Sequence, residues 1–145
     1  MKIETKYHGL VECNAEEFVQ FPSGLPGFQE EKKFLILPFS DDGTFFILQS
    51  VSTPGLGFVL TNPFPFYPEY DFKLDEQTVE ALKLESEKDV VVYTVLTMAD
   101  PFHLTTANLQ APIVVNTKKK IGKQVILTGT SYQTKHKLFV EKLAK

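Results

Sequence analysis

Asp89-Val-Val-Val-Tyr-Thr-Val-Leu-Thr-Met98 is the stretch of sequence that decides the fold class. β-Branched side chains fill its centre, and such side chains favour extended backbone over helix. These residues are Val90, Val91, Val92, Thr94 and Val95. The segment is therefore predicted to be the longest strand of the molecule.

Shorter extended segments lie on both sides of this strand, separated by turn residues such as Gly, Pro, Asn and Asp. Alternating or β-branched composition predicts strands at residues 2–7, 10–13, 17–21, 34–37, 44–51, 57–61, 102–109, 113–116 and 124–128. The turn sequence Ser40-Asp-Asp-Gly43 makes 34–37 and 44–51 a hairpin. Residues 117–123 join the last two strands, with Gly122 as their turn glycine.

Helical signals are few. Asp75 can cap a short helix over residues 76–84, and residues 134–143 form a second candidate helix. Many short strands with one or two short helices are typical of barrels and sandwiches. We therefore predict a single domain over residues 1–145, mainly β, with a barrel-like or sandwich-like antiparallel fold.

The composition is that of a globular domain, with 43% hydrophobic and 23% charged residues among 145. No apolar run approaches the ~20 residues that a membrane helix needs. Residues 1–12 lack the apolar stretch of a secretory signal. The single cysteine, Cys13, rules out an internal disulfide and fits a reducing compartment. We expect a soluble cytoplasmic protein with no membrane partner.

Charge is distributed unevenly along the chain. Residues 1–100 contain 17 Asp and Glu and 7 Lys, whereas residues 101–145 contain 8 Lys and 1 acid. Such an asymmetry suggests an acidic face that could meet a basic protein partner. Alternatively, the two halves interleave in space and their charges cancel.

Few residues suggest chemistry at an active site. His8, His103 and His136 are far apart in sequence and have no metal-ligand spacing. Asp100 and His103 could form an acid–base pair, but the sequence Asp100-Pro101 is more typical of a turn that leads into a strand. Neither the surroundings of Cys13 nor any glycine pattern matches a nucleophile or nucleotide motif. We expect a protein that is not an enzyme, with no catalytic residue, metal site or cofactor.

A lysine-rich turn offers an alternative function. Lys118, Lys119, Lys120 and Lys123 could contact phosphates, as in a small RNA-binding β module. All 15 basic residues of the chain are lysine, although arginine is the usual reader of phosphate and guanine. The net charge of −3 also disfavours nucleic acid. We therefore expect no direct nucleic-acid partner.

The most unusual segment is Asn62-Pro-Phe-Pro-Phe-Tyr-Pro-Glu-Tyr-Asp-Phe72, which holds five aromatic residues and three prolines. Prolines at these positions exclude a central strand and favour a stiff loop or edge. Rigid aromatic anchors are typical of protein-interaction hot spots. The alternative is that Phe64, Phe66 and Phe72 plug one end of the barrel, and both roles can hold for different rings.

Three blocks of the sequence together resemble one known family. The first is Phe21-Pro-Ser-Gly-Leu-Pro-Gly-Phe28 with the following strand 34–38, and the second is Asn62-Pro63 to Pro68-Glu-Tyr-Asp-Phe72. The third is Asn108-Leu-Gln-Ala-Pro-Ile-Val-Val-Asn116 with Ile121-Gly-Lys-Gln-Val-Ile-Leu127. The three blocks occur in the same order as in the FliW family of flagellar assembly factors and extend over nearly the whole chain. The sequence therefore resembles that family.

Some residues of these blocks have evident structural roles. Gly24 and Gly27 bracket Pro26 and allow a tight chain reversal. Asn108 and Asn116 bracket an apolar strand, where their amides could satisfy backbone groups at its ends.

The resemblance implies a regulator that binds flagellin and, once flagellin is exported, binds the translational repressor CsrA. Repression of flagellin mRNA would then be relieved through coupled equilibria. An acidic domain suits a basic RNA-binding partner. We expect the partner contacts to be Phe66, Tyr67, Glu69, Tyr70 and Asp71.

Overall fold

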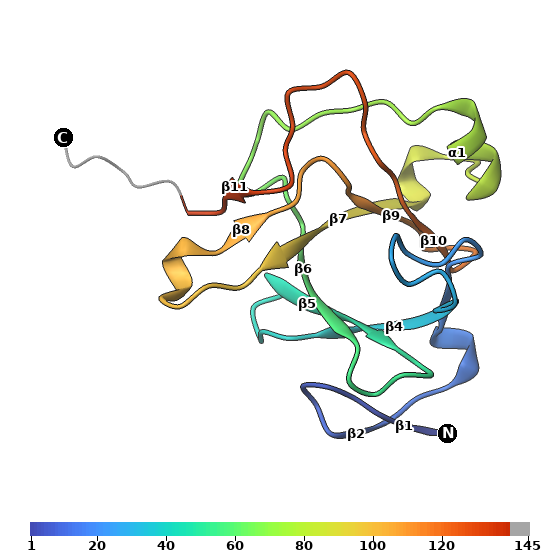
Figure 1. The fold of residues 1–145 in the computed structure, drawn as a ribbon. Helices are drawn as coiled ribbons and strands as arrows, with labels where there is room; N and C mark the ends of the chain where they lie inside the picture. Colours follow the sequence, from blue (N-terminus) through green and yellow to red (C-terminus); the bar gives the residue numbers. More distant parts are fainter. Residues whose placement is uncertain (140–145) are drawn as a thin grey trace.

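Seven strands close into a barrel in the computed structural model, which describes residues 1–139 (Figure 1). Their order is β7–β6–β5–β4–β3–β10–β9, and β9 pairs with β7 to complete the circle. In chain order they are β3 (Val19–Gln20), β4 (Lys33–Pro38), β5 (Phe45–Ser50), β6 (Gly57–Thr61), β7 (Val90–Thr97), β9 (Ile113–Asn116) and β10 (Ile121–Gln124). β3 and β10 run parallel, and the other neighbours are antiparallel. The predicted mainly β, barrel-like fold is confirmed.

Strand β7, the predicted longest strand, is the hub of the barrel. Val90–Tyr93 pairs with β9, and Thr94 and Val95 pair with β6. Its last two residues pair with β8 (Thr106–Ala107), and β8 pairs in turn with β11 (His136–Lys137). β7 therefore runs from the end of the barrel beside α1 to the end that carries β8 and β11 (Figure 1).

Phe21 and Phe34 form the centre of the barrel core. Both are fully buried, and their rings meet edge to face with centroids 5.1 Å apart. The other buried members of this cluster are Val19, Leu25, Leu48, Leu60, Ile113 and Val115. Because these side chains come from five strands and the loop after β3, one apolar cluster holds the barrel together.

A small hairpin of β1 (Lys2–Glu4) and β2 (Leu10–Glu12) packs outside the barrel. Ile3 and Cys13 are buried against Phe18 and Leu35 there. The predicted strand at 10–13 is thus confirmed, whereas the strand predicted over 2–7 ends at Glu4 because the chain turns at Thr5–Gly9.

Helices are short. α1 spans Glu76–Ala81 and begins as predicted at Asp75, whose Oδ1 accepts a hydrogen bond of 2.8 Å from the Thr78 amide. The 3-10 helices are η1 (Ala15–Glu17), η2 (Glu87–Asp89) and η3 (Phe102–Leu104). None of the helices found in residues 1–139 has the length and apolarity needed to cross a membrane.

The two motif asparagines act as predicted. Asn108 Oδ1 accepts hydrogen bonds from the amides of Gln110 and Ala111. Asn116 Oδ1 accepts from the amides of Lys118 and Lys119, and its Nδ2 donates to the Leu82 carbonyl at 2.8 Å. The second asparagine therefore fixes the lysine-rich turn and the chain after α1 at the same time.

This turn also explains one wrong prediction. The Asn116 side chain closes the turn at residues 117–120, and Ile121 pairs with Asn116 directly after it. Strand β10 therefore begins three residues before the start of the strand predicted at 124–128. Lys120 adopts a left-handed φ of 55° to allow this. Gly122 therefore lies inside β10 rather than in the turn, and residues 125–128 of the predicted strand have no strand structure.

Three further expectations need correction. The strand predicted over 102–109 is η3 followed by the two residues of β8, and residues 17–21 hold the end of η1 and the short β3. The helix predicted over 134–143 is wrong for its described part, where β11 pairs with β8 and Leu138 is buried. Residues 140–143 lie outside the described residues.

The close packing of Gly122 on Phe21 gives a first prediction. A Cβ at residue 122 would lie 2.6 Å from Phe21 Cζ, in a fully buried position. Gly122→Ala should therefore lower the free energy of unfolding by about 1–3 kcal/mol through overpacking. Gly55→Ala is the control, because a Cβ there meets nothing within 4 Å. Urea unfolding measures both, and equal stability of the two variants would contradict the packing described here.

Candidate protein-binding surface

The proline-rich segment 62–72, here called the aromatic segment, connects β6 to the region before α1 without forming a strand. Asn62 Oδ1 accepts a hydrogen bond of 3.0 Å from the Phe64 amide. The Pro63 carbonyl then accepts from the amides of Phe66 and Tyr67. Local turns and fixed proline φ angles therefore set its course, as the sequence predicted.

Tyr70 anchors the aromatic segment in the protein interior. Its ring is 4% exposed, and its hydroxyl donates a hydrogen bond of 2.7 Å to the Leu109 carbonyl. It contacts Tyr132 with centroids 4.7 Å apart and Phe72 at 5.4 Å. Burial, with a smaller contribution from Tyr132, raises the pKa of the Tyr70 hydroxyl. Tyr70 thus holds the segment in place from inside.

Tyr67 and Phe66 attach the segment to the C-terminal strands. The Tyr67 hydroxyl donates a hydrogen bond of 2.6 Å to the Lys137 carbonyl in β11. Burial raises the pKa of Tyr67 to about 12. The half-buried Phe66 ring lies between Phe45 and Phe139, at centroid distances of 6.5 and 6.0 Å. Both residues therefore have clear structural roles.

Glu69 and Asp71 differ from these aromatic residues, because both carboxylates are exposed. The Asp71 backbone is fixed, since its amide donates to the Tyr132 hydroxyl at 3.0 Å. The structure thus brings the five predicted contact residues together on one segment, with one ring in the interior and two carboxylates at the surface. That these residues contact a partner stays a prediction.

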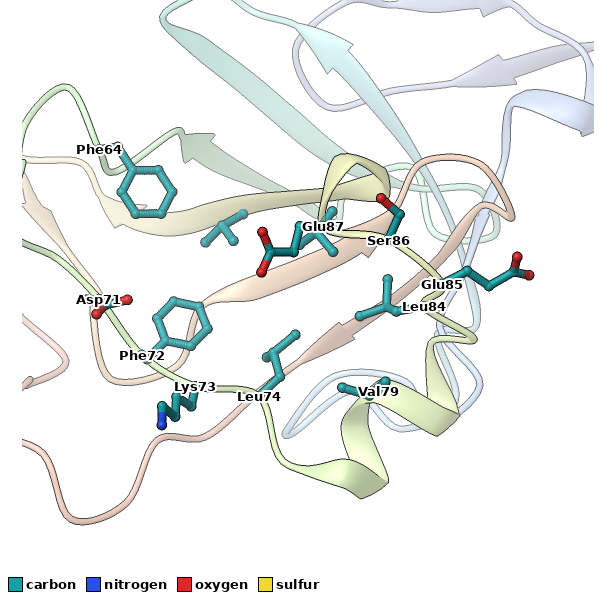
Figure 2. A pocket seen from close by; sticks show the side chains of 12 residues that line it. Phe64, Asp71, Phe72, Lys73, Leu74, Val79, Leu84, Glu85, Ser86 and Glu87 are labelled. Carbon is teal, nitrogen blue, oxygen red and sulfur yellow. The ribbon is translucent and has the colours of Figure 1, made fainter.

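Two concave surfaces flank the aromatic segment. One, the tyrosine hollow, has a volume of about 660 Å³ and lies between residues 66–70 and the chain at 131–136. The other, the acidic groove, has a volume of about 610 Å³ and lies on the side of α1 (Figure 2). The acidic groove is lined by Phe64, Asp71, Phe72, Lys73, Leu74, Val79, Leu84, Glu85, Ser86, Glu87, Val90 and Val92.

The acidic groove has an apolar floor built from separate parts of the chain. β7 supplies Val90 and Val92, α1 supplies Val79, and the aromatic segment supplies Phe64 and Phe72. Figure 2 shows Phe64 and Phe72 on the aromatic segment and Val79 on α1. The floor is therefore continuous from the proline-rich loop to the helix.

Acidic residues dominate the chain that surrounds this floor. Residues 69–89 contain eight Asp and Glu and only three Lys. Within the described part of the chain, Glu85 is the groove acid that forms an ion pair, with Lys119 Nζ at 2.9 Å. The hydrogen bond and charge of Lys119 lower the pKa of Glu85. Of the eight acids, Asp71, Glu85 and Glu87 line the groove, together with Lys73.

The other candidate residues lie elsewhere. Cys13 is buried under the N-terminal hairpin, and His103 is exposed on η3. His8 is within hydrogen-bond distance of the Pro38 carbonyl, and His136 Nε2 accepts from the Gln133 amide. Among residues 1–139, no three or more His, Cys, Asp and Glu side chains are grouped in a way that could hold a metal ion.

Sequence reasoning found the aromatic segment but missed the groove beside it. The part of the groove lining that it missed consists of Val79, residues 84–87 and the outward side chains of Val90 and Val92. A signal was present, because the same residues 69–89 hold the densest acidic stretch of the chain. What the sequence could not indicate was that β7 would place its outer face under this acidic stretch.

Comparisons with known proteins agree over almost the whole chain. The family model described as "FliW protein" matches residues 2–138. A flagellar assembly factor FliW from Geobacillus kaustophilus is 58% identical over 145 residues, covering all of both chains, and one from Bacillus subtilis is 52% identical over 94% of this chain and 95% of its own. A crystal structure of a flagellar assembly factor FliW superposes with a TM-score of 0.94 at 55% identity, covering 99% of this chain and 100% of that chain. The similarity includes the barrel and every segment that lines the groove.

Tyr70 gives a second prediction. Tyr70→Phe keeps the buried ring but removes the hydrogen bond to the Leu109 carbonyl, so the free energy of unfolding should fall by about 1–2 kcal/mol. Tyr7→Phe, at an exposed tyrosine, should leave it unchanged. Thermal or urea unfolding measures both. An unchanged Tyr70→Phe variant would show that the aromatic segment does not depend on this bond.

Tyr67 gives a prediction for alkaline pH. Tyrosine in an unfolded chain ionises near pH 10, whereas the pKa of Tyr67 in the folded protein is about 12. The stability that this difference supplies is complete below pH 10 and is lost as pH rises to about 12, because burial disfavours the ionised form of the hydroxyl. Tyr67→Phe should remove this part of the alkaline loss. Unfolding midpoints against pH test it, and identical slopes for both proteins would contradict it.

Proposed function

The chain belongs to the FliW family of flagellar assembly factors, and we propose that it binds flagellin and, when freed from flagellin, binds the translational repressor CsrA. In this scheme CsrA held by the protein no longer represses flagellin mRNA. Flagellin export then raises flagellin translation, and unexported flagellin lowers it.

The observation that supports this proposal best is the acidic groove beside the aromatic segment. CsrA acts on RNA, and an RNA-binding protein presents basic surface to phosphates. Carboxylates around an apolar floor complement a partner that combines lysine or arginine with apolar side chains. The charge complementarity would chiefly raise the association rate and the specificity, and the apolar contacts would supply affinity.

The regulation follows from mass action. A protein with two partners that exclude each other distributes between them according to the two affinities and the free concentrations. No catalytic step is required, so we propose a binding protein rather than an enzyme. We further propose that it works in the cytoplasm, where flagellin and the mRNA are made.

The alternative of a small RNA-binding module gains no support from the lysine-rich turn. Lys119 already forms an ion pair with Glu85, and Glu85 itself lines the acidic groove. A phosphate backbone approaching this turn would meet carboxylates as well as lysines.

Size-exclusion chromatography with light scattering tests the proposed function directly. The protein is mixed with flagellin, with CsrA, and with both at once. We expect a complex with each partner alone, and displacement of CsrA as flagellin is added. Absence of both complexes would overturn the proposal, and a shift of an RNA probe by the protein alone would favour the RNA-binding alternative.

A charge reversal on the aromatic segment tests the predicted contacts. Glu69→Lys should weaken CsrA binding about three- to tenfold, because an exposed carboxylate facing a basic partner is reversed. Glu16→Lys on η1 changes the net charge equally at a distant exposed position and should have little effect. Titration calorimetry at two salt concentrations measures both. Equal losses would mean that net charge alone, and not this segment, matters.

A further inference from the structure

We propose that the tyrosine hollow binds an arginine side chain of a protein partner, with the guanidinium group held against the aromatic rings and beside the Glu69 carboxylate. The proposal rests on the proposed function only in assuming a protein partner. It adds which surface is used and which chemical group that surface recognises.

Four aromatic rings line the tyrosine hollow, and they come from two distant parts of the chain. Tyr67 and Tyr70 belong to the aromatic segment, whereas Tyr132 and His136 lie near the end of the described residues. The His136 ring centroid lies 6.2 Å from that of Tyr67 and 6.3 Å from that of Tyr132. The Tyr132 centroid lies 4.7 Å from that of Tyr70. These three pairs of ring planes meet at 73°, 66° and 75°, so the rings form the walls of a hollow rather than a flat stack.

The polar atom of each ring is already bonded to the backbone. The hydroxyls of Tyr67 and Tyr70 donate to backbone carbonyls at 2.6 and 2.7 Å. The Tyr132 hydroxyl accepts from the Asp71 amide and donates to the Asp71 carbonyl. His136 Nε2 accepts from a backbone amide three residues earlier, at 2.8 Å. The rings are therefore held in place before a partner arrives, and they offer an occupant chiefly their π surface.

Glu69 gives the hollow its charge. Among residues 1–139, it is the one lining side chain that carries a charge, because His136 Nε2 accepts a hydrogen bond and the imidazole is therefore neutral. The Glu69 carboxylate is exposed and forms no ion pair within these residues. Lys137 follows His136 in β11, and successive side chains of a strand point to opposite faces, so Lys137 does not line the hollow. A cation that enters therefore meets a carboxylate and no positive charge in the lining.

Aromatic rings beside a carboxylate favour arginine among the cations of proteins. The negative face of an aromatic ring attracts a cation. A guanidinium is flat and weakly hydrated, so it can stack on a ring while its N–H groups pair with a carboxylate. The ammonium of lysine is compact and strongly hydrated, and it loses more hydration in an apolar hollow.

The size of the hollow and the composition of the chain define the occupant further. The hollow volume of about 660 Å³ lies within the range of clefts that bind ligands, roughly 300–1,000 Å³. It therefore has room for an arginine side chain and part of the backbone that carries it. This protein contains no arginine, because all its 15 basic residues are lysine. The arginine must therefore come from a different protein and not from a second copy of this chain.

An NMR titration with single amino-acid derivatives tests this inference. The probe is N-acetyl-arginine methylamide. The citrulline derivative has nearly the same shape without the charge, and the lysine derivative has the charge without the flat guanidinium. We expect the arginine probe to shift the amide resonances of residues 66–70 and 131–136, the citrulline derivative to bind at least fivefold more weakly, and the lysine derivative at least twofold more weakly.

Three outcomes of this titration would count against the inference. Equal binding of the citrulline derivative, or shifts confined to residues outside the hollow, would overturn it. Equal or tighter binding of the lysine derivative would overturn the choice of arginine.

Matched variants place the binding in the hollow. Tyr67→Leu and Tyr67→Phe both lose the hydrogen bond to β11, but only Tyr67→Leu loses the ring. Tyr67→Leu should therefore weaken binding of the arginine probe about fivefold, and Tyr67→Phe less than twofold. Glu69→Gln should weaken it about threefold, with Glu16→Gln at an exposed position on η1 as its control. Equal effects within either pair would overturn the inference.

Thermal unfolding of each variant verifies that it folds. If Tyr67→Leu does not fold, the comparison of Glu69→Gln with Glu16→Gln still decides, because both carboxylates are exposed.

The same variants separate this inference from the proposed function. If the unaltered protein binds flagellin or CsrA and Tyr67→Leu and Glu69→Gln bind equally well, the hollow is not used by the partner and the inference fails, whereas the function stands. If the protein binds neither flagellin nor CsrA but the arginine probe binds in the hollow and Glu69→Gln weakens it, the proposed function fails and the inference stands.

Discussion

The pairing of β7 with three other strands is the constraint on which the rest of the structure depends. Its first half closes the barrel against β9, its middle continues the sheet to β6, and its end supports β8 and through it β11. Successive side chains of a strand point to opposite faces, and Tyr93 and Val95 pack on the barrel core, so Val90 and Val92 face the outside of the barrel. Val90 and Val92 are therefore available as the floor of a groove, which the segments before and after α1 surround with carboxylates.

The aromatic segment has the structural role that its composition suggested, and its role in partner binding stays a prediction. Tyr70 is buried and bonded to the Leu109 carbonyl, and Tyr67 is bonded to β11, so these rings serve the interior. Glu69 lies between Tyr67 and Tyr70 in the sequence, and Asp71 follows Tyr70. Both carboxylates are exposed at the surface. The three prolines restrict the backbone of this segment already in the unfolded chain, so the segment loses less conformational entropy when it folds. A rigid loop that is anchored from inside can present carboxylates at fixed positions to a partner.

Local sequence determined most of the strands but not their ends. The β-branched centre of β7, the hairpin of β4 and β5, β6, β9 and the Asp75 cap could be predicted because each signal lies within a few residues. The strand β11 (His136–Lys137) could not be predicted, because pairing of His136 with Ala107 overrides a weak helical pattern. The start of β10 depends on the Asn116 side chain, and the groove depends on the distant packing of α1 beside β7. Such long-range contacts leave no periodic trace in the sequence.

Amide hydrogen exchange of the protein alone and saturated with CsrA tests the central claim most directly, because it locates a contact surface without altering any residue. The account predicts slower exchange in residues 64–74 and 84–92, which border the acidic groove, with little change in the β1–β2 hairpin. Slower exchange confined to that hairpin, or to the loop after β3, would contradict it. Either pattern would leave the barrel and the closure at β7 as described.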